Sequence, residues 1–293
     1  MSRFLTFERY CAPEAEEELF RLLRDGNACV LAGGTDLLIA MREKGLQPSC
    51  VVDIKRITEL QGIQSLNGGG LSVGATTTLH EIETSKLVRQ VCPVLSDAVG
   101  LIGSLQVRNR GTLGGNLSNG SPAADSAPAL LVLDAQLELA SASGTRMVPV
   151  ETFFAGPGKS VLEHGEILRR IRIPQPAPGT QSVYLKFGPR KAMDIAVVSI
   201  AVSLRWDSKG CCSDARIALG AVAPTPLRVK KAEAALIGKL DEEQIQAAVA
   251  LAAAETSPVD DIRGGRVYRA HLVKVLAARA IKEAITRHRT AKG

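Results

Sequence analysis

The sequence of 293 residues has little aromatic content, no clustered histidines or cysteines and no long apolar run. Aromatic residues make up only 3% of the chain, too few to interleave with its 36 lysines and arginines as a base-stacking surface requires. We therefore expect no nucleic-acid partner, although the formal net charge is +6. A membrane-spanning helix needs about 18 consecutive apolar residues, and the sequence has no such stretch, so we expect no membrane span.

The cysteines and histidines give no sign of a metal site. No C-x-x-C pair occurs, and Cys211 and Cys212 are adjacent in an expected turn, so neither a zinc site nor an iron–sulfur cluster is predicted. The four histidines lie far apart. The N-terminus has early acidic residues and no continuous apolar segment, which predicts no signal peptide. We expect reduced thiols and a cytoplasmic location.

What the chain does have is glycine, and the main motif covers residues 107–125. Gly111, Gly114, Gly115 and Gly120 permit close backbone approach, and short polar side chains lie between them. Successive backbone N–H groups in such a run suit a phosphate. The Gly-Gly-Asn sequence alone is equally compatible with a plain turn, but the whole run favours a ligand-binding loop.

The end of this motif predicts a helix and a polar contact. Ser121 is expected to cap a helix that has Pro122 at its first position. Asp125 would then lie in the first helical turn, where its carboxylate could accept a hydrogen bond from a sugar hydroxyl.

Another glycine motif, the first in chain order, occurs about 80 residues earlier. The apolar residues 28–32 predict a buried strand, residues 33–36 read Gly-Gly-Thr-Asp, and a helix is expected over residues 37–44. This order directs helical N–H groups toward an anion. It is neither a G-x-G-x-x-G nor a Walker sequence, and Asp36 could simply cap the helix, which is compatible with binding.

The remaining sequence predicts an α+β protein. Strands are expected at residues 51–54, 71–75, 137–140, 147–150 and 166–173, with a loop at 153–159. The proline-rich residues 174–179 indicate a domain boundary. Beyond it, three strands (182–187, 196–206 and 214–220) predict a meander, and two helices (241–255 and 266–287) follow.

Three segments in this order resemble the FAD-binding, or medium, subunit of the molybdenum hydroxylases. They are residues 32–36, residues 112–116 with the Ser-Pro-Ala-Ala-Asp sequence at 121–125, and residues 184–196. The family includes xanthine dehydrogenase, aldehyde oxidoreductase, carbon monoxide dehydrogenase and 4-hydroxybenzoyl-CoA reductase. The resemblance implies a two-part PCMH-type FAD-binding domain over 1–175, with subdomains of about 1–55 and 56–175. It also implies an α+β C-terminal domain over 180–288, in which we expect a three-stranded antiparallel sheet with helices.

The resemblance also implies roles for individual residues. Two phosphate loops would hold the cofactor, the first formed by Leu31, Ala32, Gly33, Gly34, Thr35, Asp36, Leu37 and Leu38 and the second by Thr112, Leu113, Gly114, Gly115 and Asn116. Asp125 would bind a hydroxyl, Ile102 and Leu162 would pack near the flavin end, Lys186 would lie near the isoalloxazine ring, and Ile195 would cover the flavin face without stacking. Related covalent flavoproteins have histidine where this chain has Thr35, so the FAD should be non-covalent.

By the same resemblance the chain is one subunit of an oxidoreductase complex. Its partners would be a molybdenum-cofactor large subunit and a [2Fe-2S] small subunit, in a dimer of heterotrimers. It would pass electrons between those clusters and an acceptor such as NAD, a ferredoxin or a quinone. No side chain is nominated as a catalytic residue and no residue as a metal ligand. The alternatives are a stand-alone flavin oxidase or reductase of the same fold, and a non-catalytic nucleotide-binding module.

Overall fold

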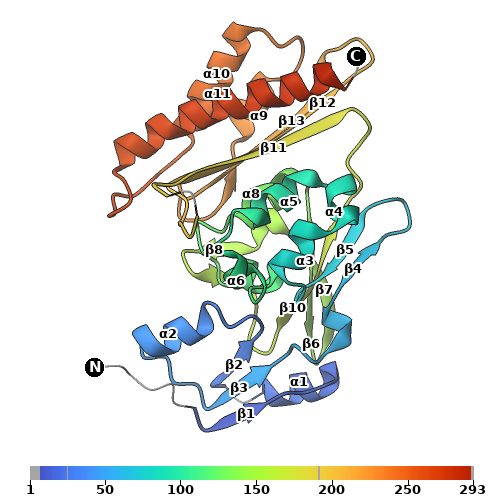
Figure 1. Ribbon diagram of the computed structural model, residues 1–293, viewed down its shortest axis with the longest axis vertical. Coiled ribbons are helices and arrows are strands. Elements are labelled where there is room, and N and C mark those ends of the chain that lie inside the picture. The colour runs from blue at the N-terminus through green and yellow to red at the C-terminus, as the bar shows by residue number, and fades with distance from the viewer. Residues whose placement is uncertain (1–6, 25, 191, 292–293) are drawn as a thin grey trace.

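The computed structural model describes residues 7–24, 26–190 and 192–291, which form three consecutive units (Figure 1). The N-terminal unit contains a three-stranded parallel sheet of order β1-β3-β2. Its elements are β1 (Arg9–Cys11), α1 (Glu16–Leu22), β2 (Ala28–Leu31), α2 (Leu37–Glu43) and β3 (Cys50–Asp53). The sequence Gly-Gly-Thr-Asp therefore joins β2 directly to α2, as predicted.

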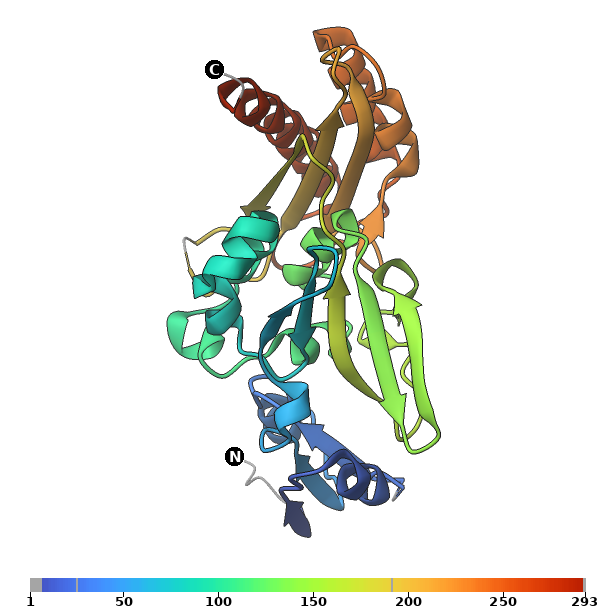
Figure 2. The ribbon, with the colours of Figure 1, turned by 90° about the vertical axis from the view of Figure 1, so that its right-hand side faces the viewer.

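The middle unit is a five-stranded antiparallel sheet of order β4-β5-β10-β6-β7, with helices gathered on one face (Figure 2). A two-stranded hairpin, β8 with β9, occupies the segment predicted as a loop. The elements are η1 (Thr58–Leu60), β4 (Ile63–Ser65), β5 (Leu71–Gly74), α3 (Leu79–Thr84), α4 (Lys86–Val91), α5 (Pro93–Gly100), α6 (Leu105–Arg108), α7 (Leu113–Ser118), α8 (Ser126–Val132), β6 (Gln136–Ser141), β7 (Gly144–Pro149), η2 (Val150–Thr152), β8 (Phe154–Gly156), β9 (Lys159–Ser160) and β10 (Ile167–Ile173).

The helix predicted from Ser121 begins later than expected. The Ser121 hydroxyl accepts a hydrogen bond from the Ala123 N–H at 3.2 Å, which closes a local turn instead of capping a helix. Helix α8 begins at Ser126, so Asp125 precedes the helix and does not lie in its first turn. Asp125 makes no capping hydrogen bond, which leaves its carboxylate for other partners.

The C-terminal unit has a four-stranded antiparallel sheet of order β11-β12-β13-β14, not the predicted three strands. The additional strand is only two residues long and pairs with Ala218 and Leu219, which explains why periodicity did not reveal it. The elements are β11 (Thr180–Phe187), β12 (Val198–Trp206), β13 (Cys212–Gly220), β14 (Leu227–Arg228), α9 (Lys230–Ala235), α10 (Glu242–Ala254) and α11 (Arg266–Thr290). Lys191, part of the third resemblance segment, lies outside the described residues.

This C-terminal sheet is buried on both faces, which fixes it to the middle unit. Side chains alternate along β12, since successive residues of a strand point to opposite faces. Ile200 and Val202 pack in the core with α10 and α11, whereas Ala201 packs in the core of the middle unit with Ala218 and Tyr184. Figure 1 shows α11 crossing one face of the sheet, with α5 and α8 below the sheet.

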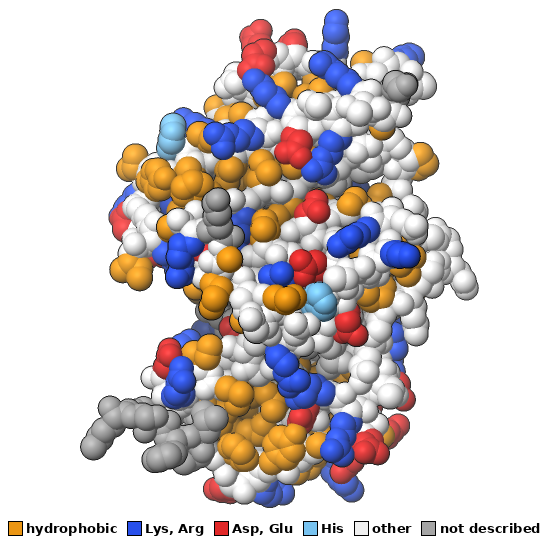
Figure 3. Space-filling view, in the orientation of Figure 1, with side chains coloured by type: hydrophobic (Ala, Val, Ile, Leu, Met, Phe, Trp, Pro, Cys, Tyr) orange, Lys and Arg blue, Asp and Glu red, His pale blue; other side chains and the backbone are white. Residues whose placement is uncertain are grey.

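The surface is mixed in charge. On the face shown in Figure 3, lysines and arginines are interspersed with acidic side chains, and the molecule is indented between the N-terminal and middle units. In the part of the chain that the structure describes, no helix is both long and apolar enough to cross a membrane.

Candidate functional site

A pocket of about 770 Å³ lies where the N-terminal and middle units meet, and residues 193–195 of the C-terminal unit complete it. This volume falls within the range of small-molecule and cofactor sites. Both glycine motifs line it, together with apolar side chains at its ends. Among the described residues, no group of histidine, cysteine, aspartate or glutamate is arranged to hold a metal ion.

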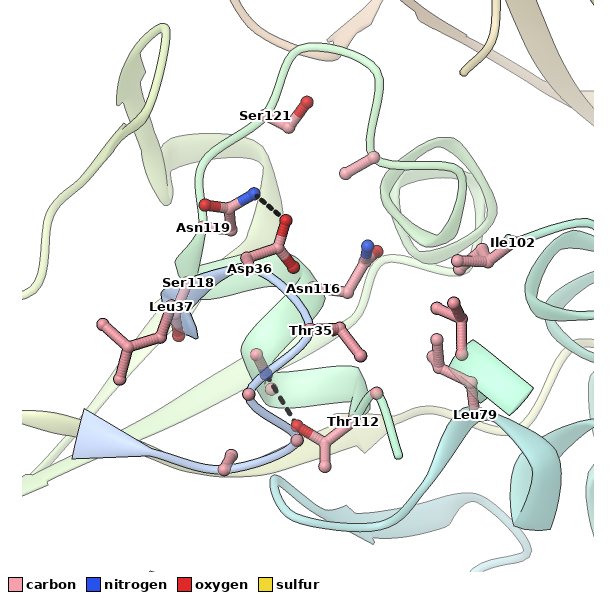
Figure 4. Close-up of a pocket in the computed structure, with 18 of the residues that line it drawn as sticks. Thr35, Asp36, Leu37, Leu79, Ile102, Thr112, Asn116, Ser118, Asn119 and Ser121 are labelled. Atoms are coloured by element: carbon pink, nitrogen blue, oxygen red, sulfur yellow. Dashed lines mark hydrogen bonds between the residues drawn. The ribbon is translucent and has the colours of Figure 1, made fainter. Parts of the chain in front are cut away.

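The first glycine loop lies directly against the second (Figure 4). A Cβ atom added to Gly33 would collide with the carbonyl oxygen of Arg110 and would lie 2.8 Å from the Cα of Gly111. Gly34 has φ of +78°, a conformation that a residue with a side chain rarely adopts. The amide of Asn119 donates to Asp36 Oδ1 at 3.2 Å and so links the loops again. Residues about 80 positions apart therefore form one continuous wall.

The second glycine motif is the first turn of α7 and not a loop throughout. Thr112 Oγ1 accepts a hydrogen bond from the Gly115 N–H at 3.1 Å and caps the helix. The Gly114 N–H donates to the Ala75 carbonyl at 2.9 Å, and a Cβ on Gly114 would lie 2.7 Å from that same oxygen. A Cβ on Gly115 would lie 2.9 Å from the Thr112 hydroxyl, so this capping side chain would have to move, and it would meet no other atom within 4 Å, leaving aside the backbone of its own helix. Apart from that hydroxyl, the space beside Gly115 is free.

Short polar side chains surround this wall. Figure 4 shows Thr35, Asn116, Ser118, Asn119 and Ser121 around the same space. Asn116 Oδ1 accepts a hydrogen bond from the Ser126 hydroxyl at 2.6 Å, which leaves its NH₂ group as a donor. Asp36 precedes α2 but makes no capping hydrogen bond, so it does not act as the helix cap considered above. Partial burial raises the pKa of Asp36.

On the side of the C-terminal unit, Asp125 is held by two donors from β11. Tyr184 donates its hydroxyl to Asp125 Oδ1 at 2.7 Å, and Lys186 Nζ lies 2.7 Å from Oδ2. Lys186 also donates to the Leu101 carbonyl at 3.0 Å. Burial raises the pKa of Asp125, while Lys186 and Tyr184 oppose that shift. Burial and the neighbouring Asp125 carboxylate raise the pKa of Tyr184 well above its ordinary value, so the phenol stays protonated and donates a hydrogen bond here.

Most of the residues expected at the site line the pocket. These are Ala32, Gly33, Gly34, Thr35, Asp36, Leu37, Ile102, Thr112, Gly114, Gly115, Asn116, Asp125, Leu162 and Ile195. Leu31, Leu38, Leu113 and Lys186 do not. Leu113 is fully buried in the middle unit, and Lys186 lies behind Asp125 and reaches the pocket only through that carboxylate.

Several lining residues had no signal in the sequence. Ile54, Leu79 and Leu168 supply apolar surface, but they come from three separate segments and belong to no motif. Glu166 also lines the pocket, and its Oε2 atom accepts from Arg146 at 2.7 Å, which lowers the pKa of this glutamate. Met193 is held at φ of 55°, in a segment that contacts Gly103.

The fold and the pocket are those of a cofactor-binding oxidoreductase subunit, and comparison with known proteins identifies the family. Residues 5–176 match the FAD binding domain in molybdopterin dehydrogenase, and residues 183–284 match the CO dehydrogenase flavoprotein C-terminal domain. The chain is 36% identical over 282 residues to the xanthine dehydrogenase FAD-binding subunit of Escherichia coli O157:H7, covering 95% of this chain and 96% of that protein.

It is also 37% identical over 281 residues to the carbon monoxide dehydrogenase medium chain of Hydrogenophaga pseudoflava, covering 95% of this chain and 97% of that protein. A solved structure of the carbon monoxide dehydrogenase from that organism matches with a TM-score of 0.93 at 36% identity, over 97% of this chain and 99% of that chain. Quinoline 2-oxidoreductase from Pseudomonas putida 86 matches with a TM-score of 0.91 at 34% identity, over 98% and 99%. The chain therefore belongs to the FAD-binding subunits of the molybdenum hydroxylase family.

Proposed function

We propose that this chain holds one FAD, without a covalent bond, in the pocket between its N-terminal and middle units. We further propose that it passes electrons between the [2Fe-2S] clusters of a partner subunit and an external acceptor or donor such as NAD, a ferredoxin or a quinone. The observation that carries the proposal is the single wall made by two distant glycine motifs, with Gly115 open to the pocket.

The residues present fit such a cofactor. A pyrophosphate needs backbone N–H groups and short polar donors with little bulk. The backbone at Gly33 and Gly34 and the side chains of Thr35, Asn116 and Ser118 offer these along the wall. Asp125, buried yet lining the pocket, has lone pairs left to accept a hydrogen bond from a hydroxyl group. Apolar side chains at the pocket ends, among them Leu79 and Ile102, suit flat ring systems. Thr35 supports non-covalent binding because threonine is not a flavin attachment residue in the related covalent proteins.

FAD supplies the redox chemistry, because it exchanges electrons singly or in pairs, and the protein binds it and sets its surroundings. Tyr184 and Lys186 fix the orientation and the charge of Asp125. Lys186 lies behind Asp125 and neutralises its buried carboxylate, which reduces the negative charge that this wall presents to a bound cofactor. Ile195 and Met193, both more than half exposed, would cover one end of the site without aromatic stacking.

The assembly is proposed on the same grounds. The relatives are named as FAD-binding subunits and medium chains, which supports a molybdenum-cofactor large subunit and a [2Fe-2S] small subunit as partners. We propose a dimer of heterotrimers in the cytoplasm. We also propose that residues 1–175 form the FAD-binding domain and residues 180–288 the C-terminal domain, a division that the proline-rich segment between β10 and β11 supports.

The test is a visible absorption spectrum of the purified full chain, with the released cofactor identified by mass, followed by purification with its genomic neighbours. The expected result is acid-releasable FAD, no iron absorbance from this chain alone, and a stable complex with one larger and one smaller partner. A chain that neither contains nor binds FAD would contradict the proposal. A flavin-containing chain that turns over a substrate alone would instead favour the stand-alone enzyme.

A further inference from the structure

Arg169 on β10 has a side chain that contacts both of the units between which the pocket lies. Leu168 pairs with Leu139 of β6, and Arg170 pairs with the adjacent β6 residue, Glu138. Arg169 therefore has no partner in β6 and is the extra residue of a β-bulge. A bulge redirects a side chain and is often found next to a functional site. The two residues before it, Ile167 and Leu168, line the pocket itself.

The side chain of Arg169 bridges the N-terminal and middle units. Its Nε donates to Glu16 of α1 at 2.6 Å, and its Nη1 donates to Glu138 of β6 at 3.0 Å. The two carboxylates are largely buried, with side-chain exposures of 17% and 6%. Hydrogen bonds between ionised groups are about twice as strong as neutral ones, so this bridge resists separation of the units. The unit that it holds carries the first glycine loop.

The backbone of Arg169 leads to the second glycine motif. The Arg169 carbonyl accepts from the Ala75 N–H at 3.0 Å, and the Ala75 carbonyl accepts from the Gly114 N–H at 2.9 Å. The start of α7 is therefore fixed to the bulge through a single intermediate residue. The side chain of Arg169 thus anchors the unit that carries the first glycine motif. The backbone of Arg169 anchors the second motif through Ala75.

We propose that Arg169 is a positioning residue for the cofactor, which sets the spacing of the two glycine motifs by fixing Glu16 of the N-terminal unit to the bulge. The inference rests on the proposed FAD site. It does not assign Arg169 a contact with the cofactor, since Arg169 is not among the residues that line the pocket. Without the bridge, the units remain joined by apolar packing of Ile167 and Ala140 with residues such as Leu19, so the chain should still fold.

Matched controls are available on the same strand and the same helix. Arg172 also donates to Glu138, at 3.0 Å from its Nε, and within the described residues its side-chain hydrogen bonds go to Glu138 and not to the N-terminal unit. Glu17 neighbours Glu16 in the first turn of α1 and is exposed. Arg172→Gln therefore controls for losing an arginine on Glu138, and Glu17→Ala controls for losing a carboxylate at the start of α1.

The experiment titrates FAD into the flavin-free full chain and measures the dissociation constant by fluorescence. We expect Arg169→Gln and Glu16→Ala each to raise it about tenfold, the equivalent of about 1.4 kcal/mol. The double variant with both changes should also raise the dissociation constant about tenfold, and not a hundredfold, because both changes break the same bridge. Arg172→Gln and Glu17→Ala should stay within about twofold. Amide hydrogen exchange of residues 31–38 should become faster in Arg169→Gln and in Glu16→Ala, and should not change in the two controls.

Other results would overturn the inference. Equal FAD affinity in Arg169→Gln and the parental chain, with only a lower melting temperature, would show that the bridge serves stability alone. Additive effects in the double variant would show that Glu16 and Arg169 act separately. If Arg169→Gln did not fold, Glu16→Ala, which breaks the same contact from the other side, would decide the question. Failure of the parental chain to bind FAD would remove the proposed function and this inference with it.

Discussion

In the first glycine motif both glycines are required by the backbone, whereas in the second motif only Gly114 lies against backbone and Gly115 lies against a single side chain. At residue 33 any side chain would collide with the Arg110 carbonyl, so glycine is required there. At residue 34 the positive φ requires glycine. Gly114 is required by Ala75, but Gly115 meets only the Thr112 hydroxyl. The comparison separates glycines that let two parts of the chain touch from a glycine that leaves space for a ligand. Only the second kind reports on binding.

The largest effect is expected from Gly114→Val. The new side chain would meet the Ala75 backbone, which is itself held by the Arg169 carbonyl and cannot move freely. Overpacking of this kind costs about 1–3 kcal/mol or more, so the melting temperature should fall and FAD should be lost together. Thermal unfolding and the amount of acid-released flavin measure the two effects. Normal flavin content in this variant would refute the assignment of the second motif.

Gly115→Ala should separate binding from stability. Alanine is favoured over glycine within a helix by about 1 kcal/mol, but its Cβ would displace the Thr112 hydroxyl that caps α7, at a similar cost of about 1 kcal/mol, so the melting temperature should change little. The added methyl group occupies space beside the pocket, and we expect FAD affinity to fall about tenfold, equivalent to about 1.4 kcal/mol. Calorimetric titration with FAD checks this. Unchanged affinity would mean that the cofactor does not approach Gly115.

Tyr184→Phe tests the wall opposite the glycines. It removes a hydrogen bond to the buried Asp125 while the ring stays in place. Leaving a buried acceptor short of a donor costs about 1–3 kcal/mol, and Asp125 should become less well oriented. Denaturant unfolding and FAD titration should both show a loss. A loss of stability with unchanged FAD affinity would argue against a role for Asp125 in binding.

Asn119→Ala breaks the polar link between the two motifs. The Asn119–Asp36 hydrogen bond is 3.2 Å long and exposed, so its removal should cost only about 0.5–1.5 kcal/mol and weaken FAD binding a few-fold. Ser118→Ala, at a neighbouring residue that also lines the pocket, is the comparison variant for loss of a polar group without loss of the link. Equal effects of the two changes would show that the link itself has no role.

The smallest effect is expected from a change at Asp36, the acidic residue of the first motif. Partial burial raises the pKa of Asp36, so the folded state favours its protonated form. The associated stability is present below the ordinary value of 3.8 and is lost as pH rises through the higher folded value. Asp36→Asn should therefore make the flavin-free chain slightly more stable at pH 7 and flatten the pH dependence above 3.8. Unfolding free energies across that range measure it, and a less stable variant would contradict the sign.

The sequence was most informative where a pattern was local. The strand–glycine–helix order around Gly33, the Pro-rich segment after β10 and the long helix α11 all follow from neighbouring residues, and the structure has them. The helix start at Ser121 was wrong because a serine followed by a proline also closes a short turn. Helices α6 and α9 and strand β14, of two to six residues, are too short for periodicity to reveal.

The site was predictable in its polar half and not in its apolar half. Gly33, Thr112 and Asp125 stood in recognisable motifs, and all three line the pocket. Leu79 and Leu168 reach the pocket only because distant segments fold together, and the bridge from Arg169 to Glu16 joins residues 153 positions apart. Such contacts leave no local trace in one sequence.

The most direct test of the account is a titration of the flavin-free full chain with FAD, followed by hydrogen exchange of the complex. The account predicts one FAD per chain and slower exchange in both residues 31–38 and residues 111–116, since one cofactor contacts both glycine motifs. Saturable binding that protects neither segment, or only one of them, would contradict the central claim that the two motifs form a single site.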